Sequence, residues 1–230
     1  MKLIQNPPLF ADLPSCLLYL RGDPGVGFKD WSPYHRTVTP IGNTSNSTVY
    51  TFFPPKSISS PASGGLSLGA SSDFEIGTGP FTFSAYVNLG AGAISNAVTI
   101  FMRGATGYAT WMDIDWESGA HGFELYIGGS YICGSSNTSP FTAGTPYHIY
   151  VNRSTANLVN LYINGTSVAN TTSSANIHAD PNGYSVGASA AGTAGIYGYM
   201  DEIALWRQYI PITALCPLLS AKGLGRRMIV

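Results

Sequence analysis

Three acidic residues alternate along one short segment, Trp111-Met-Asp113-Ile-Asp115-Trp-Glu117. Alternate residues of a β-strand share a face, so we expect Trp111, Asp113, Asp115 and Glu117 on one side and apolar residues on the other. Carboxylates beside an indole ring can bind sugar hydroxyls, can carry out acid–base hydrolysis, or can form a polar face in contact with solvent. The spacing alone leaves all three interpretations open.

The other titratable residues form no recognisable catalytic pattern. The four histidines are scattered, no two have the spacing of a zinc site, and no Gly-x-Ser-x-Gly element accompanies them. The glycine-rich stretch 187–198 joins two predicted strands without a helix N-terminus, so we interpret it as a hairpin loop and not as a phosphate site. A net charge of −1 gives no global field to attract nucleic acid or an anionic membrane.

The composition favours many short strands. Only 10% of the 230 residues are charged, while Gly and Tyr number 27 and 14. The first residues lack the apolar stretch of a signal peptide, and no apolar run is long enough for a membrane span. We therefore expect an unexported protein whose three cysteines are reduced and buried. A bridge between Cys16 and Cys216 is the alternative, because both lie in terminal strand-like segments.

Segments in which apolar and polar residues alternate, separated by turn residues, predict the strands. Residues 81–89 place phenylalanine, alanine and valine on one face and polar residues on the other. Residues 148–152 and 158–164 form a predicted hairpin around 154–157, and Asn164-Gly165 predicts a tight turn into the next strand. We expect a short strand at 49–53, another at 73–76, and a long loop over 22–48.

Together these elements predict an all-β, two-sheet antiparallel jelly-roll sandwich without helices, apart from a helical turn within 211–219. Nothing divides the chain in the middle. The predicted organisation is an irregular N-terminal arm over 1–14, a sandwich over 15–210 and a C-terminal tail over 211–230.

A series of weak motifs, in a fixed order, carries a family resemblance. The motifs are Leu18-Tyr-Leu, Lys29-Asp30-Trp-Ser32, Gly65-Leu-Ser-Leu68, Phe81-Thr-Phe-Ser-Ala-Tyr-Val87, Leu161-Tyr-Ile-Asn-Gly165, Tyr184-Ser-Val-Gly187 and Gly198-Tyr-Met-Asp-Glu-Ile203. In this order, from about residue 16 to 209, the chain resembles the laminin-G-like branch of the concanavalin A-like lectin/glucanase superfamily. The resemblance implies a jelly-roll sandwich whose concave sheet often holds sugar.

The resemblance also suggests site residues. The segment with Asp113, Asp115 and Glu117 resembles the Glu-x-Asp-x-Glu strand of the superfamily's β-glucanases, where two carboxylates act as nucleophile and acid/base. Asp113 stands where that family has glutamate, and its shorter side chain argues against hydrolysis. By motif position, Asp30 and Asp201 are the residues that would hold a calcium ion, the only cofactor that the resemblance suggests.

Relatives of this kind also occur in bacteriophage virions. We therefore expect a non-enzymatic virion surface protein, either a capsid decoration or a tail-fibre component, assembled in the host cytoplasm. Its expected partners are the major capsid or tail proteins, further copies of itself and host-surface glycans, without nucleic acid or membrane insertion. The alternatives are a glycoside hydrolase using Asp113, Asp115 and Glu117, in which Glu117→Gln abolishes cleavage, and a free glycan-binding module.

Overall fold

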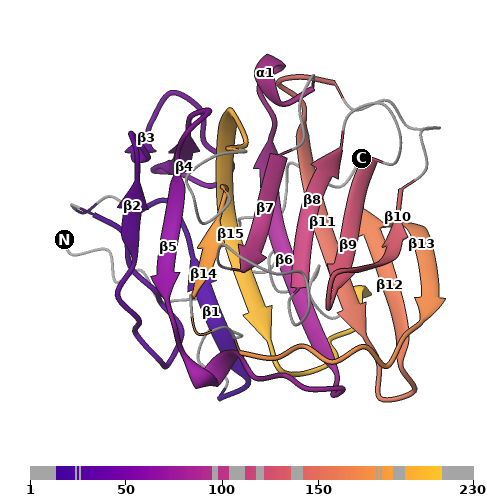
Figure 1. The fold of residues 1–230 in the computed structure, drawn as a ribbon. Helices are drawn as coiled ribbons and strands as arrows, with labels where there is room; N and C mark the ends of the chain where they lie inside the picture. The colour runs from indigo at the N-terminus through magenta and orange to yellow at the C-terminus, as the bar shows by residue number, and fades with distance from the viewer. Residues whose placement is uncertain are drawn as a thin grey trace.

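The protein is a sandwich of two antiparallel β-sheets (Figure 1). The computed structural model describes residues 14–23, 25, 27–94, 98–103, 112–117, 122–135, 142–179, 181, 183–188 and 195–213. Sheet A has eight strands in the order β13-β12-β11-β6-β15-β4-β3, with β1 also beside β15. Sheet B has seven strands in the order β10-β9-β8-β7-β14-β5-β2. This architecture confirms the predicted fold class.

The strands of each sheet have the following bounds. Sheet A contains β1 (Cys16–Leu20), β3 (Ser45–Ser47), β4 (Ser57–Ser60), β6 (Phe81–Asn88), β11 (Pro146–Arg153), β12 (Leu158–Ile163), β13 (Thr166–Thr172) and β15 (Gly198–Trp206). Sheet B contains β2 (Thr39–Ile41), β5 (Gly65–Gly69), β7 (Val98–Arg103), β8 (Met112–Glu117), β9 (Gly122–Ile127), β10 (Ser130–Gly134) and β14 (Tyr184–Val186).

The predicted hairpin and its following turn are confirmed. β11 pairs with β12 around the turn at 154–157, and β12 turns directly into β13. Asn164 and Gly165 have φ values of 50° and 82°, the left-handed pair that a type I′ turn requires. Local turn chemistry therefore fixes the register of this side of sheet A.

Four local predictions are wrong. Residues 49–53 form no strand, because the strand of this region is β4, which begins after the two prolines at 54–55. The expected strand at 73–76 is a 3₁₀ turn, Ser72–Phe74, whose N-cap Ser71 accepts from the Asp73 N–H. The expected loop over 22–48 contains β2 and β3, and a short helix, α1 (Ala91–Ile94), follows β6.

The core lies between the two sheets. Phe83 of sheet A and Phe101 of sheet B meet there with ring centroids 5.3 Å apart, and both side chains are fully buried. In Figure 1, β7, β8 and β9 of sheet B lie in front of β6 and β11 of sheet A. The longest strands of the sandwich, β6, β11 and β15, thus lie side by side in the middle of sheet A and close the core from that side.

The outer face of sheet A is also covered. All eight residues of β6 are buried, including the polar side that alternation alone would leave open. Tyr86 packs against Phe53 at 4.9 Å and stacks on His148 at 4.4 Å. The central part of sheet A is therefore closed to a large ligand on both faces. No helix in the described part of the chain is long and apolar enough to cross a membrane.

Candidate functional site

The acidic segment singled out in the sequence is a central strand of sheet B. β8 pairs with β9 on one side and β7 on the other. Asp113 stands opposite Tyr126, and Asp115 stands opposite Glu124. Residues directly opposite each other in antiparallel strands share a face. Trp111 lies outside the described residues, so its place in the predicted site remains a prediction.

Two rows of residues cross this end of sheet B. Tyr131 of β10 stands opposite Tyr126 of β9, which stands opposite Asp113 of β8. Gly134, Glu124 and Asp115 form the neighbouring row over the same three strands. We call Glu124, Tyr126 and Tyr131 the tyrosine patch.

The tyrosine patch combines an exposed ring with an anchored carboxylate. Tyr131 is 50% exposed and meets the Tyr126 ring edge-on at 5.7 Å. Tyr126 donates its hydroxyl to Glu124 Oε2 at 2.8 Å, and Glu124 is buried. Burial, followed by the charge of Glu124, raises the pKa of Tyr131, so its hydroxyl stays protonated at neutral pH.

A glycine makes room for this arrangement. A Cβ on Gly134 would lie 2.9 Å from the Tyr131 hydroxyl and 3.2 Å from Glu124 Cγ. The tyrosine patch was missed in the sequence, although the alternation of residues 122–127 places Glu124 and Tyr126 on one face. Only the pairing of β9 with β8 shows that this face continues to Asp113.

The carboxylate of Asp30, one of the two predicted calcium ligands, accepts hydrogen bonds from several protein groups. Its Oδ1 accepts the N–H groups of Tyr19 at 3.1 Å and Ser32 at 2.9 Å. Its Oδ2 accepts the Arg36 N–H at 3.2 Å and pairs with the Arg36 guanidinium at 3.3 Å. Calcium requires a shell of oxygen ligands, and a guanidinium beside the same oxygen opposes it.

Asp201, the other predicted ligand, has a similar role on β15. Its Oδ1 accepts from the N–H groups of Gly22 at 2.9 Å and Glu202 at 3.0 Å, and its Oδ2 accepts from Ser57 Oγ at 3.2 Å. Burial, followed by the charge of Glu202, raises the pKa of Asp201 to about 8. Asp201 therefore holds the end of β1 in place while carrying a proton near neutral pH.

These residues do not fit a calcium site. Asp30 and Asp201 each have both carboxylate oxygens occupied by protein donors, and no group of three or more potential metal ligands occurs among the described residues. The cavity beside Asp201 and Glu202 has a volume of about 30 Å³, enough for a water molecule but not for a sugar. Calcium binding remains a prediction from the resemblance alone.

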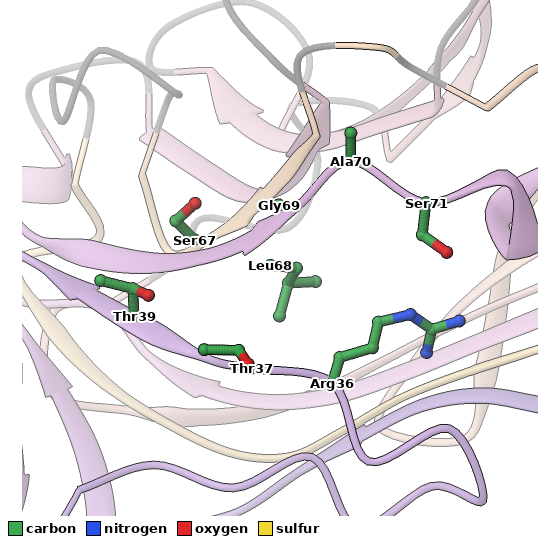
Figure 2. A pocket seen from close by; sticks show the side chains of 8 residues that line it. All are labelled: Arg36, Thr37, Thr39, Ser67, Leu68, Gly69, Ala70 and Ser71. Atoms are coloured by element: carbon green, nitrogen blue, oxygen red, sulfur yellow. The ribbon is translucent and has the colours of Figure 1, made fainter.

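A larger pocket lies at the opposite edge of sheet B (Figure 2). We call it the edge pocket; its volume is about 390 Å³ and it is lined by Arg36, Thr37, Thr39, Ser67, Leu68, Gly69, Ala70 and Ser71. Figure 2 shows Arg36 and Thr37 along one side, Ala70 and Ser71 along the other, and Leu68 between them. No feature of the sequence had marked these residues as a site.

The cysteines show no sign of reactivity in the described residues. Cys133 is buried, and burial raises the pKa of its thiol to about 11. Cys16 is buried in β1, and its Sγ lies 3.4 Å from the Leu18 carbonyl. Cys216 lies outside the described residues, so the alternative bridge to Cys16 is untested.

Comparison with known families identifies the class of protein. Residues 61–211 match the family model described as the concanavalin A-like lectin/glucanases superfamily. The chain therefore belongs to that superfamily, as the ordered motifs indicated. A search of curated proteins finds no match.

Solved structures share the fold at low sequence identity. The binding domain of Paraclostridial Mosquitocidal Protein 1 superposes with a TM-score of 0.69 at 11% identity, covering 90% of this chain and 52% of that one. The receptor binding domain of botulinum neurotoxin C/D mosaic serotype gives 0.66 at 13% identity, with coverages of 91% and 51%. The binding domain of Botulinum Neurotoxin DC in complex with SialylT gives 0.62 at 12%, with coverages of 93% and 52%.

The present chain thus spans about half the length of these solved structures. At such identities the likeness establishes a shared fold and nothing about shared residues.

Proposed function

We propose that this protein is a non-enzymatic, lectin-like binding module that takes host-surface glycans on the outer face of sheet B. The observation that carries the proposal is the row Tyr131–Tyr126–Asp113 across three adjacent strands. Neighbouring strands lie about 4.8 Å apart, so the row spans about 10 Å, the length scale of one or two sugar rings.

The chemistry of the row suits a carbohydrate. A half-exposed tyrosine ring offers an apolar surface to the C–H face of a pyranose while its hydroxyl stays available for hydrogen bonds. A carboxylate accepts hydrogen bonds from sugar hydroxyls strongly because the acceptor is charged. Family membership and the named binding domains of similar fold support the same class of function.

Glu124, the acidic residue next to the β8 carboxylates, is not available as a catalytic group. A glycosidase needs two carboxyl groups that both reach the scissile bond from opposite sides. Glu124, the carboxylate opposite Asp115, is buried and accepts the hydroxyl of Tyr126, so it supports the patch and does not face a substrate. The hydrolase alternative therefore gains no further carboxylate and still rests on Asp113, Asp115 and Glu117 of β8.

The proposal places the module on a virion, as a capsid decoration or tail-fibre component. This part rests on the resemblance to modules of bacteriophage particles and on a sequence in which only 10% of the residues are charged. Immunogold labelling of particles with an antibody to this protein tests it directly. Label on intact particles is expected, and label restricted to unassembled protein contradicts the placement.

A glycan array tests the binding site. We expect the wild type to bind a defined set of glycans, and Tyr131→Ala or Asp113→Asn to weaken that binding about tenfold, since each loses roughly 1.4 kcal/mol of contact. Tyr209→Ala is the matched control, because Tyr209 is a 37% exposed tyrosine that follows β15 of sheet A. A blank array for folded wild-type protein, or equal losses in the control, would contradict the proposal.

The same glycans separate binding from cleavage. Incubation with the wild type is expected to leave them intact. Cleavage that disappears in Glu117→Gln would establish the hydrolase alternative and overturn the non-enzymatic assignment.

A further inference from the structure

The two sheets are open, and three of their edge strands are protected against pairing with another chain. Sheet A ends in β13 and β3, and sheet B ends in β10 and β2. An edge strand presents unpaired N–H and C=O groups, which proteins protect by a short strand, a proline, a charge or a bulge. β3 and β2 have three residues each, and β2 contains Pro40. The register of β10 shifts between Tyr131 and Cys133.

β13 carries little of this protection. It is seven residues long, and residues 154–177 around it contain neither a charged residue nor a proline. Its pairing with β12 has one register shift near the hairpin turn, and residues 169–172 pair regularly beyond it. We call residues 169–172 the β13 edge. Figure 1 shows β13 at the right margin of the molecule, where it contacts β10 of sheet B.

Half of the backbone groups of the β13 edge point away from the protein. Just after this edge, Ser173 donates its N–H to the Asn157 carbonyl at 2.9 Å, on the side of β12. In an antiparallel ladder, every second residue exchanges hydrogen bonds with the partner strand, and the residues between point away from it. Thr171 therefore points toward β12, whereas Asn170 and Thr172 point away. No described strand pairs with β13 on that side.

A row of amide side chains ends at the same edge. Asn152 of β11 stands opposite Asn160 of β12, which stands opposite Asn170 of β13. Asn160 Nδ2 donates to Asn152 Oδ1 at 3.1 Å, and Asn152 Nδ2 donates to the Ile210 carbonyl at 3.1 Å. The amides are thus ordered by bonds toward the centre of sheet A, and the row finishes at the exposed Asn170.

From this edge we infer that two copies of the chain associate through β13, antiparallel about a two-fold axis, with Asn170 opposite Asn170 of the second copy. In this register the outward backbone groups of the two Asn170 residues bond to each other. A primary amide has both donors and an acceptor, so the two side chains can also pair across the axis. The two copies of sheet A then form one continuous sheet.

The composition of the edge favours a second copy over a different protein. A two-fold interface places each surface against itself, so any charge on it meets a like charge. The stretch 154–177 has no charge to oppose this contact, and it has none to select a partner of opposite charge. An amide at the axis is its own complement.

The predicted contact is small. Leu158, which is 41% exposed, stands opposite Thr172 on β12, and side chains of the second copy can cover part of it. An interface built on one strand pair and its neighbours buries little surface, so we expect reversible association in the micromolar range.

The pairing has a consequence for the tyrosine patch. Tyr131 belongs to β10, and β10 contacts β13, so the dimer brings the two copies of the patch near the shared interface. Two binding sites on one particle increase the strength of attachment to a surface that carries many glycans. This consequence rests on the proposed function, whereas the pairing itself does not.

Sedimentation equilibrium of the full-length protein tests the inference. The wild type is expected to change from monomer to dimer as its concentration rises. Asn170→Lys places two like charges directly opposite each other and should raise the dissociation constant at least about tenfold. Thr39→Lys, at an exposed position of the edge strand β2, is the matched control and should dimerise as the wild type does.

A mixture of two charged variants separates a lost contact from a damaged fold. Asn170→Lys and Asn170→Glu should each be monomeric alone, and an equal mixture should form a heterodimer, because opposite charges then face each other. Restored association requires both variants to be folded and Asn170 to lie close to its counterpart.

Hydrogen exchange locates the contact on the strand. In the wild type, the amides of Asn170 and Thr172 should exchange more slowly at high protein concentration than at low concentration. The amide of Thr171, which already points to β12, is the internal control and should be unaffected.

Several results would overturn the inference. They are a wild type that stays monomeric up to millimolar concentration, an Asn170→Lys variant that dimerises normally, and a mixture of the charged variants that fails to associate. Tyr131→Ala should leave dimerisation unchanged. Failure of glycan binding therefore does not count against the dimer, and a monomeric protein does not count against the glycan site.

Discussion

At the scale of single residues, two arginines have most of their donors occupied inside the protein. Arg36 is divided between two carboxylates and two aromatic rings at the edge of the sandwich. Arg153, at the end of β11, is fully buried, and its hydrogen bonds to the described residues all go to neutral carbonyl groups. Burial lowers the pKa of Arg153 to about 10, so it keeps its charge at neutral pH.

Arg153 reinforces the contact between two segments that meet at an isolated β-bridge, Gly77 with Ile177. Its Nε donates to the Gly79 carbonyl at 2.9 Å, and its Nη2 donates to the carbonyls of Gly77 at 2.8 Å and Gly79 at 2.7 Å. Its Nη1 donates to the Ala175 carbonyl. The loop before β6 is thereby tied to the segment after β13.

Replacing this arginine should be costly. We expect Arg153→Leu to lower the free energy of unfolding by about 3 kcal/mol, because three buried carbonyls lose charged donors. Arg207→Leu, at an exposed arginine, should change it by less than about 0.5 kcal/mol. Urea denaturation of both variants measures the difference. Equal urea midpoints for the two variants would show that the hydrogen bonds of Arg153 contribute little to stability.

Neither arginine could be assigned from the sequence. A candidate site at Asp113, Asp115 and Glu117 can be predicted because the alternation lies within one segment. The partners of Arg153 and Arg36, in contrast, come from segments distant in the sequence. The edge pocket has no local signature for the same reason, since it depends on where the pairing of β2 with β5 ends.

At the scale of elements, the strands that could be predicted are those whose own residues decide their conformation. β6, β11 and β12 alternate over several residues, and Asn164-Gly165 permits only a tight turn. β2 (Thr-Pro-Ile) and β3 (Ser-Asn-Ser) are only three residues long, and they are strands because β5 and β4 offer them partners. A segment as short as these carries too little pattern to be recognised alone.

Two glycines distinguish local strain from tertiary packing at the strand ends. Gly165 has φ +82° with open space around its missing Cβ, so Gly165→Ala should cost about 1 kcal/mol, from backbone strain only. At Gly198, where β15 begins, a Cβ would lie 1.9 Å from the Asn88 carbonyl oxygen.

Gly198→Ala should therefore destabilise the protein more than Gly165→Ala, because the ends of β15 and β6 must move apart. Thermal unfolding of the two variants gives the order. A higher melting temperature for Gly198→Ala than for Gly165→Ala would contradict this, because it would mean that β15 and β6 can move apart at these ends at little cost.

At the scale of the whole molecule, two buried titratable groups make the free energy of unfolding depend on pH, one lowering it in acid and the other lowering it as the pH rises. His148 stacks on Tyr86, shares a hydrogen bond of 2.9 Å with Ser84, and is kept neutral because burial lowers its pKa to about 4. The proton associated with Asp201 and Glu202 is retained because burial raises the pKa of Asp201 to about 8. In the folded protein at neutral pH, both buried groups on the outer side of sheet A are therefore uncharged.

The signs of the two effects follow from proton uptake. Below pH about 6.5 the unfolded chain protonates His148 and the folded chain does not, so stability falls toward pH 4, by about 3 kcal/mol in total. Between pH about 4 and 8 the folded chain keeps the Asp201 proton and the unfolded chain has lost it, so stability falls as pH rises.

The two contributions can be separated by single variants. In urea titrations, His148→Phe should keep the ring stack and reduce the loss of stability between pH 6.5 and 4. Asp201→Asn keeps an oxygen for the Gly22 N–H and should reduce the loss between pH 6 and 8. Each variant removes one titrating group and retains most contacts. The comparison is therefore between the slopes of the free energy of unfolding against pH, and not between absolute stabilities. Identical slopes in wild type and both variants would mean that neither group changes its protonation on folding.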